Sequence, residues 1–431
     1  MTTSCQAPPA SWTARDAEHW LLSLELFGMR FGLDRMRALM AALNTPNEAF
    51  RAIHVVGTNG KSSTVRMIAA LLAAHGVRAG AYLSPHLVTF AERIRIDGED
   101  SSPQAFAAAA GRAWAAAQVV DATLAPDDGV TQFEALTAAA YSQLAEEAVE
   151  VAVVEAGLGG RWDATNVIDA EIVVLTNIGL EHTRWLGDTV EQIAREKLAV
   201  LAPGATLVLG AGLHPAADEQ AVLAAKRQNA TIVRAPAQPE ELAPGVRLLA
   251  RGEFQRGNFA LACSAARAYL GALEQAPVHA AAASTAVPGR FEVIADAAGS
   301  ELVLDGAHNA AGIAALTESL PAHLAGRRLV AVVSVLDDKD AAVMLASLLA
   351  LCAGVVYTAS ANPRARPATE LATLAGPLPD AVVSRVEKDP RRALVLAREL
   401  AGPEGVVLAT GSIYLVADLV RPAGAGPGSA L

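Results

Sequence analysis

The stretch HVVGTNGKSST, residues 54–64, places glycines, a lysine and hydroxyl side chains where an apolar run meets a helical pattern. Gly57 and Gly60 allow backbone N–H groups to turn inward and approach an anion closely. A helix that opens at Lys61 adds its positive N-terminal charge, and the ammonium group can reach a terminal phosphate. The order of strand, loop, Lys-Ser and helix predicts a phosphate-binding loop, although Val55 stands where the common pattern has glycine.

The loop carries Thr58 and Asn59 between its two glycines, and two serines follow the lysine directly. A hydroxyl group in this position can bind a phosphate oxygen or a magnesium ion. Ser62 and Ser63 are both candidates for that role, and their spacing does not decide between them.

Polar side chains also stand at the ends of three other apolar runs of strand length: Ser84, Glu155 and His182. Ligands of open α/β sheets bind beyond the carboxyl ends of the strands, so we expect these side chains to face one site. A carboxylate at the end of a buried strand is costly unless a cation or hydrogen-bond donors accompany it. With water and phosphate oxygens the set can form a magnesium shell, although Ser84 alone is equally suited to capping a turn.

The stretch EAGLGGRWDATN, residues 155–166, predicts a second loop that faces a ligand. Its three glycines let the backbone approach a bound molecule closely, and Arg161 and Asp163 stand beside them. Further along, Lys197 lies in the helical stretch DTVEQIAREKLAV. Because Glu196 is adjacent, this lysine has the spacing of a solvated or salt-bridged side chain, and the spacing favours no other role.

Polar residues of the second half complete the set of candidates. Asn258 stands near the start of a helical stretch, and Arg290 lies where a second domain is expected to begin. Beyond the apolar run 302–304 comes DGAHN, which contains Asp305 and His308. Asp305 is suited either to accept hydrogen bonds from ribose hydroxyls or to cap the following helix.

These candidates require strands and helices in alternation to position them. Apolar runs of strand length occupy residues 52–56, 78–83, 151–155, 172–177 and 206–209. Helical patterns occupy residues 61–75, 104–118, 132–145 and 189–200. Continuous apolar strands separated by helices predict an α/β fold with a mainly parallel sheet, covered by helices on both faces.

A second, smaller α/β domain is expected after a linker. Residues 270–288 are rich in Ala, Ser, Thr and Pro and show little periodicity. New strand-like runs then occupy residues 291–294, 302–304, 329–334, 355–358, 381–383 and 406–408, with helices between them. We therefore divide the chain into residues 1–285, including a linker from about 271, and residues 286–431.

Composition narrows the class of protein. The chain has 431 residues, 52% of them hydrophobic, which is enough material for two cores. Its formal net charge is −11 without a long basic run, so we expect neither nucleic acid nor a membrane as partner. The uncharged residues 341–360 are long enough to span a bilayer, but the aspartates before them and Gly354 within them predict a buried helix followed by a strand.

Cysteine usage and the N-terminal sequence predict a cytoplasmic protein. Cys5, Cys263 and Cys352 are odd in number and widely spaced, which indicates neither a disulfide framework nor a metal cluster. The first residues, MTTSCQAPPASW, contain no basic region followed by an apolar stretch, so we expect no signal peptide. We also expect the protein to work as a monomer.

Taken in order, the motifs resemble one family. The chain resembles folylpolyglutamate synthase/dihydrofolate synthase, in the Mur ligase superfamily, through the ordered set HVVGTNGKSS, SPHL, ER, FE, EAGLGGRWDATN, TNIGLEHT, EK, GNF, GRFE, DGAHN and GSIYLVAD. The resemblance runs from Phe31 to Asp418. It implies a P-loop ATPase domain of the Mur ligase type with a mainly parallel sheet, followed by a smaller Rossmann-like α/β domain.

The resemblance implies an ATP-dependent amide ligase. In such an enzyme a folate or pteroate carboxylate attacks the γ-phosphate of ATP and forms an acyl phosphate and ADP. The amine of L-glutamate then displaces phosphate. Positioning and charge neutralisation dominate phosphoryl transfer, and Mg²⁺ with a lysine supplies the positive charge. The implied substrates are ATP, L-glutamate and dihydropteroate or a folate.

The same resemblance implies a role for individual residues, each at a matching motif position. The residues implied at the ATP site are Gly57, Thr58, Asn59, Gly60, Lys61, Ser62, Ser63, Asn258, Arg290 and Asp305. Those implied for magnesium are Ser84, Glu155 and His182. Those implied for the pterin or folate side are Phe31, Gly32, Phe133, Arg161 and Trp162. Lys197 is implied to be carbamylated and to help hold a second magnesium, and with Lys61 and His182 it forms the implied catalytic set.

This chain departs from the family pattern at three places. Ser62 replaces a glycine, Glu181 replaces the usual aspartate, and the lysine motif reads EKLAV where EKAGI is common. The first departure leaves both serines of the loop as candidates for the metal. The second keeps the charge and lengthens the side chain by one methylene group.

Other functions remain to be weighed. A ligase of peptidoglycan precursors would carry an additional N-terminal domain, whereas 56 residues precede Gly57 here. A regulatory P-loop NTPase would not need GRFE and DGAHN, and a non-catalytic folate-binding protein would not need the loop, the metal ligands and Lys197. The motifs do not separate dihydrofolate synthase, folylpolyglutamate synthase and a bifunctional enzyme.

Overall fold

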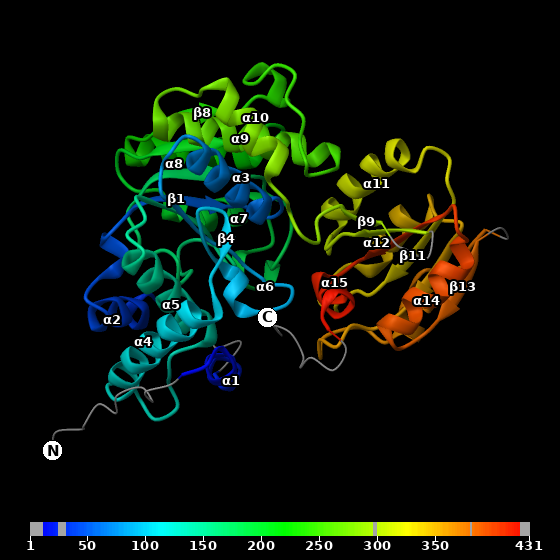
Figure 1. Ribbon diagram of the computed structural model, residues 1–431, viewed down its shortest axis with the longest axis horizontal. Coiled ribbons are helices and arrows are strands. Elements are labelled where there is room, and N and C mark those ends of the chain that lie inside the picture. Colours follow the sequence, from blue (N-terminus) through cyan, green and yellow to red (C-terminus); the bar gives the residue numbers. More distant parts are fainter. Residues whose placement is uncertain (1–11, 25–31, 296–299, 380–381, 423–431) are drawn as a thin grey trace.

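Two α/β lobes lie side by side in the structure, a computed structural model that describes residues 12–24, 32–295, 300–379 and 382–422 (Figure 1). The larger lobe contains an eight-stranded sheet with the order β4-β3-β2-β5-β1-β6-β7-β8. The smaller lobe contains a six-stranded sheet with the order β13-β12-β11-β14-β10-β9. The predicted fold class, two α/β domains with mainly parallel sheets, is confirmed.

The larger lobe is built from the first eight strands and the first ten helices. Its strands are β1 (Arg51–Val56), β2 (Ala79–Tyr82), β3 (Ile94–Ile96), β4 (Glu99–Asp100), β5 (Val151–Glu155), β6 (Ala170–Leu175), β7 (Thr206–Leu209) and β8 (Thr231–Arg234). Its helices are α1 (Ala14–Ser23), α2 (Asp34–Ala42), α3 (Lys61–Ala74), α4 (Pro103–Asp121), α5 (Gln132–Glu146), α6 (Thr183–Leu186), α7 (Val190–Lys197), α8 (Pro215–Gln228), α9 (Glu253–Leu270) and α10 (Gln275–Ser284).

The smaller lobe follows the same alternation. Its strands are β9 (Glu292–Ala295), β10 (Glu301–Leu304), β11 (Leu329–Val333), β12 (Gly354–Tyr357), β13 (Val383–Val386) and β14 (Val406–Thr410). Its helices are α11 (Ala310–Leu324), α12 (Ala341–Leu349), α13 (Ala368–Leu374), α14 (Pro390–Ala401) and α15 (Ile413–Val420). All strand pairs are parallel except β9 with β10.

The central strand β1 divides the core of the larger lobe in two. Ile53 and Val55 pack with α3, α9 and α10, whereas Ala52 and Val56 pack on the face that α4 and α5 cover. Because alternate residues of β1 face two covered sides, the strand is mostly apolar on both faces, and the buried His54 is the exception within it.

The register of β1 brings three loops together. In the parallel pairing with β5, Val55 lies opposite Glu155, and in the parallel pairing with β6, Val56 lies opposite Leu175. The carboxyl ends of these strands consequently meet at one edge of the sheet, and the loops that follow them emerge side by side.

The interpretation of residues 270–288 as a linker is wrong for much of its length. These residues contain α10, which packs on the same core as α3 and buries Val278, Ala281 and Ala282. The helix reads QAPVHAAAAS, so nearly every position is small or apolar and no polar face marks its period. Short alanine side chains still allow close packing against the neighbouring helix.

Three strands were not predicted and one is displaced. The hairpin β3–β4 and the edge strand β8 are short and carry charged residues, which hid their pattern. The strand expected at 381–383 is β13, Val383–Val386, whose largely exposed residues give no apolar run. The uncharged residues 341–360 form α12 and β12 as predicted. In the ranges that the structure covers, no helix has the length and apolar character needed to cross a membrane.

A substitution at Gly210, directly after β7, tests the packing of adjacent strand ends. A Cβ atom there would lie 2.3 Å from the backbone carbonyl oxygen of Thr176, which follows β6 and has little room to move. We expect Gly210→Ala to lower the free energy of unfolding of the larger lobe by about 1–3 kcal/mol. Urea unfolding followed by tryptophan fluorescence measures this lobe, because all five tryptophans lie in it: Trp12, Trp20, Trp114, Trp162 and Trp185.

Gly257→Ala in α9 is the matched control for that substitution. A Cβ atom at Gly257 has its nearest neighbour at 4.0 Å, and alanine is a better helix former than glycine. We expect this variant to keep or raise the unfolding free energy. If both variants lost the same stability, the crowding at Gly210 would not be the cause.

Candidate functional site

The predicted phosphate loop joins β1 to α3 through two glycines with left-handed or otherwise restricted backbone angles. Gly57 has φ +149° and Gly60, the residue before α3, has φ +81°. A Cβ atom on Gly57 would lie 1.9 Å from Thr176 Oγ1, and one on Gly60 would lie 2.5 Å from Asn258 Oδ1. Glycine is therefore required twice, and Asn258 of α9 lies directly against the loop.

The residues after β6 hold the loop in place. The N–H group of Thr58 donates to the carbonyl oxygen of Asn177 over 2.9 Å, and the N–H group of Asn59 donates to Asn177 Oδ1 over 2.9 Å. Thr176 Oγ1 donates to the carbonyl oxygen of Asn59 over 2.7 Å, and the Gly179 N–H group donates to Thr58 Oγ1 over 3.0 Å. The loop conformation is thus fixed by backbone and side-chain groups of the neighbouring strand end.

The strand-end carboxylate of Glu155 lies beside the first turn of α3. Its side chain is buried, with 2% of the residue exposed. Ser62 Oγ donates to Glu155 Oε1 over 2.9 Å, and the Ser84 N–H group donates to Oε2 over 3.1 Å. Burial raises the pKa of Glu155, while Lys61 and these two donors act in the opposite direction. The structure places Ser62, and not the buried Ser63, against this carboxylate.

The lysine of the loop folds back over it. Lys61 Nζ donates to the carbonyl oxygen of Thr58 over 3.1 Å. The ammonium group therefore stands at the mouth of the loop, on the same side as Glu155, whose ionised form it favours.

His182 lies near these groups but is not joined to Glu155. It begins α6 with φ 52°, and its Nε2 lies 4.0 Å from Oε1 of Glu181. Burial lowers the pKa of His182 to about 3, so the ring is neutral at physiological pH and can act as a nitrogen ligand. Neither a hydrogen bond nor an ion pair connects it to Glu155 within the part of the chain that the structure describes.

The residues implied for magnesium would suit an ion that also takes water and phosphate oxygens as ligands. Among the described residues, no group of three or more His, Cys, Asp or Glu side chains is close enough to hold a metal on its own. Glu155 with Ser62 and Ser84 forms a corner of oxygen donors beside the phosphate loop. Magnesium is bound in this way where substrate phosphates complete its shell.

The glycine-rich loop after β5 is held from within by Asp163. Its carboxylate accepts hydrogen bonds from Leu158 N–H over 2.8 Å, from Thr165 N–H over 3.1 Å and from Thr165 Oγ1 over 2.6 Å. His54 lies in β1 in the middle of the sheet, and its Nε2 lies 2.9 Å from Thr165 Oγ1. Because that hydroxyl already donates to Asp163, Nε2 of His54 is the donor. No motif in the sequence indicated this role for His54.

Lys197 ends α7 directly under the glycine-rich loop. A Cβ atom on Gly160 would lie 2.4 Å from the Glu196 carbonyl oxygen and 2.8 Å from Lys197 Cα. Lys197 is 4% exposed, and burial, followed by the field of Lys61, lowers its pKa to about 7. It is a buried amine, and not the solvated or salt-bridged lysine that its spacing suggested. The adjacent Glu196 pairs instead with Arg161, whose Nε lies 3.1 Å from Oε1.

The structure brings only some of the residues implied for the folate side close to one another. Phe133 lies against the glycine-rich loop, because a Cβ atom on Gly157 would meet its ring at 2.6 Å. Trp162 is 47% exposed and lines a cavity of about 290 Å³ together with Trp185. Gly32 stands with φ +139° just before α2 and has no neighbour within 4 Å of a Cβ position. Phe31 lies outside the described residues.

Asp305 of the smaller lobe does not cap the helix that follows it, so that interpretation is wrong. Asn309 is the cap of α11 and accepts from the Gly312 N–H group over 2.8 Å. Asp305 is buried and accepts instead from the N–H groups of Phe291 and Ala307 over 2.8 and 2.7 Å. Burial raises its pKa and Arg290 opposes this, which places Arg290 in its electrostatic neighbourhood.

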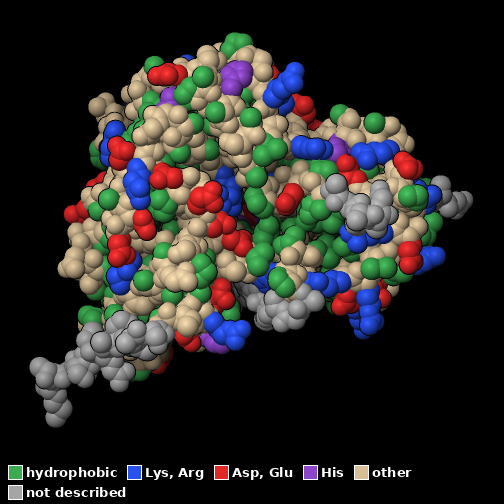
Figure 2. Space-filling view, viewed as in Figure 1, with side chains coloured by type: hydrophobic (Ala, Val, Ile, Leu, Met, Phe, Trp, Pro, Cys, Tyr) green, Lys and Arg blue, Asp and Glu red, His purple; other side chains and the backbone are tan. Residues whose placement is uncertain are grey.

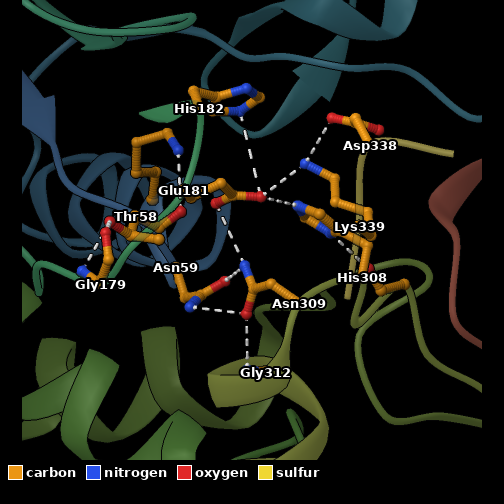
Figure 3. A network of polar contacts seen from close by, with 12 residues as sticks. Thr58, Asn59, Gly179, Glu181, His182, His308, Asn309, Gly312, Asp338 and Lys339 are labelled. Carbon is orange, nitrogen blue, oxygen red and sulfur yellow. Dashed lines mark hydrogen bonds and ion pairs between the residues drawn. The ribbon is translucent and has the colours of Figure 1, made fainter. Parts of the chain in front are cut away.

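The two lobes meet at the phosphate loop through a polar network (Figure 3). Asn309 Nδ2 donates to Asn59 Oδ1 over 3.0 Å, and Asn59 Nδ2 donates to Asn309 Oδ1 over 3.3 Å. Glu181 of the larger lobe contacts His308, Asn309 and Lys339 of the smaller lobe. Of these, His308 and Asn309 belong to the motif DGAHN that the sequence singled out, whereas Lys339 was not a candidate. The charged run DDKD after an apolar strand was the signal for Lys339, but it was interpreted only as a helix start.

Figure 2 shows one face of the molecule, on which acidic and basic side chains are interspersed over both lobes.

Two family models match the chain. The Mur ligase middle domain matches residues 55–234, and the Mur ligase glutamate ligase domain matches residues 289–413. The dihydrofolate synthase/folylpolyglutamate synthase of Mycobacterium tuberculosis is 35% identical over 379 residues, covering 80% of this chain and 77% of the relative. The enzyme of the same name from Bacillus subtilis is 31% identical over 428 residues, covering 94% and 98%.

Solved structures agree with these matches. Mycobacterium tuberculosis folylpolyglutamate synthase complexed with ADP has a TM-score of 0.86 at 33% identity, covering 94% of this chain and 97% of that one. A bifunctional folylpolyglutamate synthase/dihydrofolate synthase with Mn, AMPPNP and L-glutamate bound has a TM-score of 0.82 at 28% identity, covering 96% and 98%.

The two loop serines are separated by substitution. We expect Ser62→Ala to weaken Mg²⁺-dependent binding of ADP by about ten- to hundredfold, because the hydroxyl orients Glu155. Ser63→Ala is the matched control and should change the affinity far less, since Ser63 is buried in α3. Calorimetric titration of ADP with and without Mg²⁺ measures both. A larger loss for Ser63→Ala would reverse the assignment.

The low pKa of Lys197 predicts a reactive amine. A lysine with a pKa of about 7 is protonated below that pH and becomes a neutral nucleophile as the pH rises through it. We expect a carbamate signal in ¹³C NMR at a fixed pressure of ¹³CO₂, growing between about pH 6 and 8. The signal should be absent in Lys197→Met and present in Lys226→Met. A spectrum of Lys197→Met that still shows it would exclude this residue.

Proposed function

The chain belongs to the Mur ligase family of dihydrofolate synthases and folylpolyglutamate synthases, and we propose that it joins L-glutamate to a carboxyl group of dihydropteroate or a folate. It is an ATP-dependent glutamate ligase and converts ATP to ADP and phosphate in each cycle. The observation that carries the assignment is the meeting of the phosphate loop, the buried Glu155 and Asn309 of the smaller lobe at one place.

The proposed nucleotide site uses groups from both lobes. Backbone N–H groups of the loop and the start of α3 face the phosphates, and Lys61 neutralises their charge. Asn258 lies against the loop from α9. Asp305 and Arg290 lie on the smaller lobe, where we propose that they contact the rest of the nucleotide. Of the residues implied at the ATP site, we propose that the nucleotide is bound by Gly57, Thr58, Asn59, Gly60, Lys61, Ser62, Asn258, Arg290 and Asp305.

We propose that Ser84, Glu155 and His182 hold magnesium, with Ser62 placing the carboxylate. When bound, the ion supplies positive charge beside the phosphates and fixes their orientation. Glu155 is suited to this because its burial is unfavourable without a cation, and His182 is suited because its ring is neutral.

The folate acceptor is proposed to lie along the glycine-rich loop. Phe133 lies against that loop, the exposed Trp162 belongs to it, and the neighbouring Arg161, which pairs with Glu196, adds a cation for a carboxylate. Lys197 lies against the same loop, and a carbamate on it would supply the negative charge that the family resemblance assigns to holding a second magnesium. Asp163 keeps the loop in this shape and is a positioning residue.

The reaction proceeds in two balanced steps. An oxygen of the acceptor carboxylate bonds to the γ-phosphorus of ATP, the bond to the bridging oxygen breaks, and ADP leaves. The ammonium group of L-glutamate loses one proton to give a neutral amine, whose nitrogen bonds to the acyl carbon. The C–O bond then breaks to release phosphate, and the second proton passes from the nitrogen to the departing phosphate. Lys61 and the loop N–H groups hold the phosphates in line in the first step.

The domain boundary, the oligomeric state, the cellular location and the identity of the acceptor are predictions. We propose a boundary between the domains near residue 285, just before the matched glutamate ligase domain begins at residue 289. A monomeric state and a cytoplasmic location are also predictions from the sequence. Whether the acceptor is dihydropteroate, a folate polyglutamate or both depends on the fit of the acceptor pocket.

ADP release by purified protein tests the function. With Mg²⁺, ATP and L-glutamate present, we expect dihydropteroate or tetrahydrofolate, offered separately, to stimulate ADP formation. Lys61→Ala should reduce the stimulated rate by about a hundredfold or more, because it removes the cation at the phosphates. Lys226→Ala, a substitution on the exposed surface of α8, should leave the rate unchanged.

The outcome also distinguishes the alternatives. Stimulation by a UDP-muramyl peptide and by neither folate acceptor would identify a ligase of peptidoglycan precursors. ADP formation that ignores every acceptor and L-glutamate would indicate a plain NTPase. Substantial turnover by Lys61→Ala would contradict the role of the loop.

A further inference from the structure

Glu181 of the larger lobe contacts the smaller lobe beside the phosphate loop (Figure 3). Its Oε1 lies 3.1 Å from Lys339 Nζ and 3.1 Å from His308 Nε2. Its Oε2 accepts from Asn309 Nδ2 over 3.1 Å. One carboxylate of the larger lobe therefore receives three nitrogen donors from two separate loops of the smaller lobe.

The charges at this junction are removed from water. The side chains of Glu181 and Lys339 are 6% and 8% exposed. Burial opposes the ionisation of Glu181, yet His308 and Lys339 hold its pKa well below the usual range. An isolated buried charge would be strongly unfavourable, so loss of either partner leaves the other without compensation.

His308 contacts both Glu181 and its own loop. Its Nδ1 lies 2.9 Å from the carbonyl oxygen of Gly306, and its Nε2 lies 3.1 Å from Oε1 of Glu181. Both neighbouring oxygens are hydrogen-bond acceptors. Lys339 is similarly shared, because its Nζ also lies 3.2 Å from Asp338 Oδ2.

The same carboxylate is linked to the phosphate loop through one amide. Asn309 caps α11, donates to Glu181 and exchanges two hydrogen bonds with Asn59. A shift of the smaller lobe would therefore break contacts to Glu181 and to Asn59 together. The position of the smaller lobe is therefore coupled directly to the loop that we assign to the phosphates of ATP.

We propose that Glu181 is a positioning residue of the ligase, which docks the loops at 306–309 and 337–339 on the phosphate loop and so sets one closed arrangement of the two lobes. The proposal rests on the proposed function, because it concerns how the lobe matched by the glutamate ligase domain is presented to the activated acceptor. It is a geometric role, since alignment of two reacting groups can change a rate by orders of magnitude.

The first test compares Glu181→Gln, Lys339→Met and the double variant. The glutamine side chain keeps the shape of glutamate but removes the charge that Lys339 and His308 share. We expect each single variant to lower kcat by about ten- to hundredfold, with a smaller change in KM for ATP. The kcat of the double variant should be no lower than that of the more impaired single variant, because both substitutions remove the same interaction.

The second measurement follows the arrangement of the lobes themselves. Spin labels at Val222→Cys in α8 and Val395→Cys in α14 report the distance between the lobes, since these positions are 44% and 52% exposed. A Cys5→Ser background leaves Cys263 and Cys352, which are both buried. We expect one narrow distance distribution for the otherwise unaltered chain with ADP and Mg²⁺, and a broader, longer distribution for Glu181→Gln.

Ser319→Ala is the matched control. Ser319 Oγ accepts from the Glu253 N–H group over 3.0 Å and so joins the lobes away from the nucleotide loop. This variant should keep both kcat and the narrow distribution. If Glu181→Gln behaves like Ser319→Ala in both measurements, the proposal is wrong. If Glu181→Gln fails to fold, Lys339→Met makes the same test from the other lobe. Loss of stimulated ADP formation in the unaltered chain would instead contradict the proposed function.

Discussion

Glu155 is held almost out of contact with water at the end of a central strand, and its surroundings are arranged to keep that carboxylate in place. Ser62 donates from the first turn of α3, the Ser84 N–H group donates from the end of the next strand, and Lys61 adds its positive field. Ser62 and Lys61 belong to the unit of β1 and α3, Ser84 follows β2, and Glu155 itself ends β5. The requirement to satisfy one buried charge thus fixes the relative placement of three units of the sheet.

A second polar column stabilises the loop on which the acceptor is proposed to lie. His54 in β1 donates to Thr165, which donates to Asp163, and Asp163 in turn accepts from the N–H group of Leu158. The column runs from the interior of the sheet to the glycine-rich loop. It leaves Gly160 so close to the end of α7 that Lys197 is enclosed and its pKa falls to about 7. The lowered pKa of the lysine is a result of this packing, since burial disfavours the charged amine.

Much of the scaffold could be predicted because parallel strands covered on both faces are apolar throughout, and because glycines at 57 and 60 have a local steric cause. What the sequence could not supply were pairings between distant segments. Glu181 and Lys339 are 158 positions apart, and nothing in either neighbourhood indicates the other. The cap of α11 was assigned to Asp305 as one alternative, while Asn309 makes it, because both residue types suit a cap and only the backbone geometry decides. The helix α10 was missed because alanine on every side conceals the buried face.

The reciprocal amide pair between Asn59 and Asn309 gives the junction of the lobes a character that a charged contact alone would lack. Within the pair, each amide donates one hydrogen bond and accepts one, which fixes the orientation of both groups. Neither amide carries a charge. At 0.1 M salt, dissolved ions largely screen the interaction between exposed charges that lie more than about 10 Å apart. They screen buried groups much less. A neutral pair has no net charge for them to screen. The junction should accordingly keep its geometry across a wide range of ionic strength, while the anionic substrates that approach it from solution feel the salt fully.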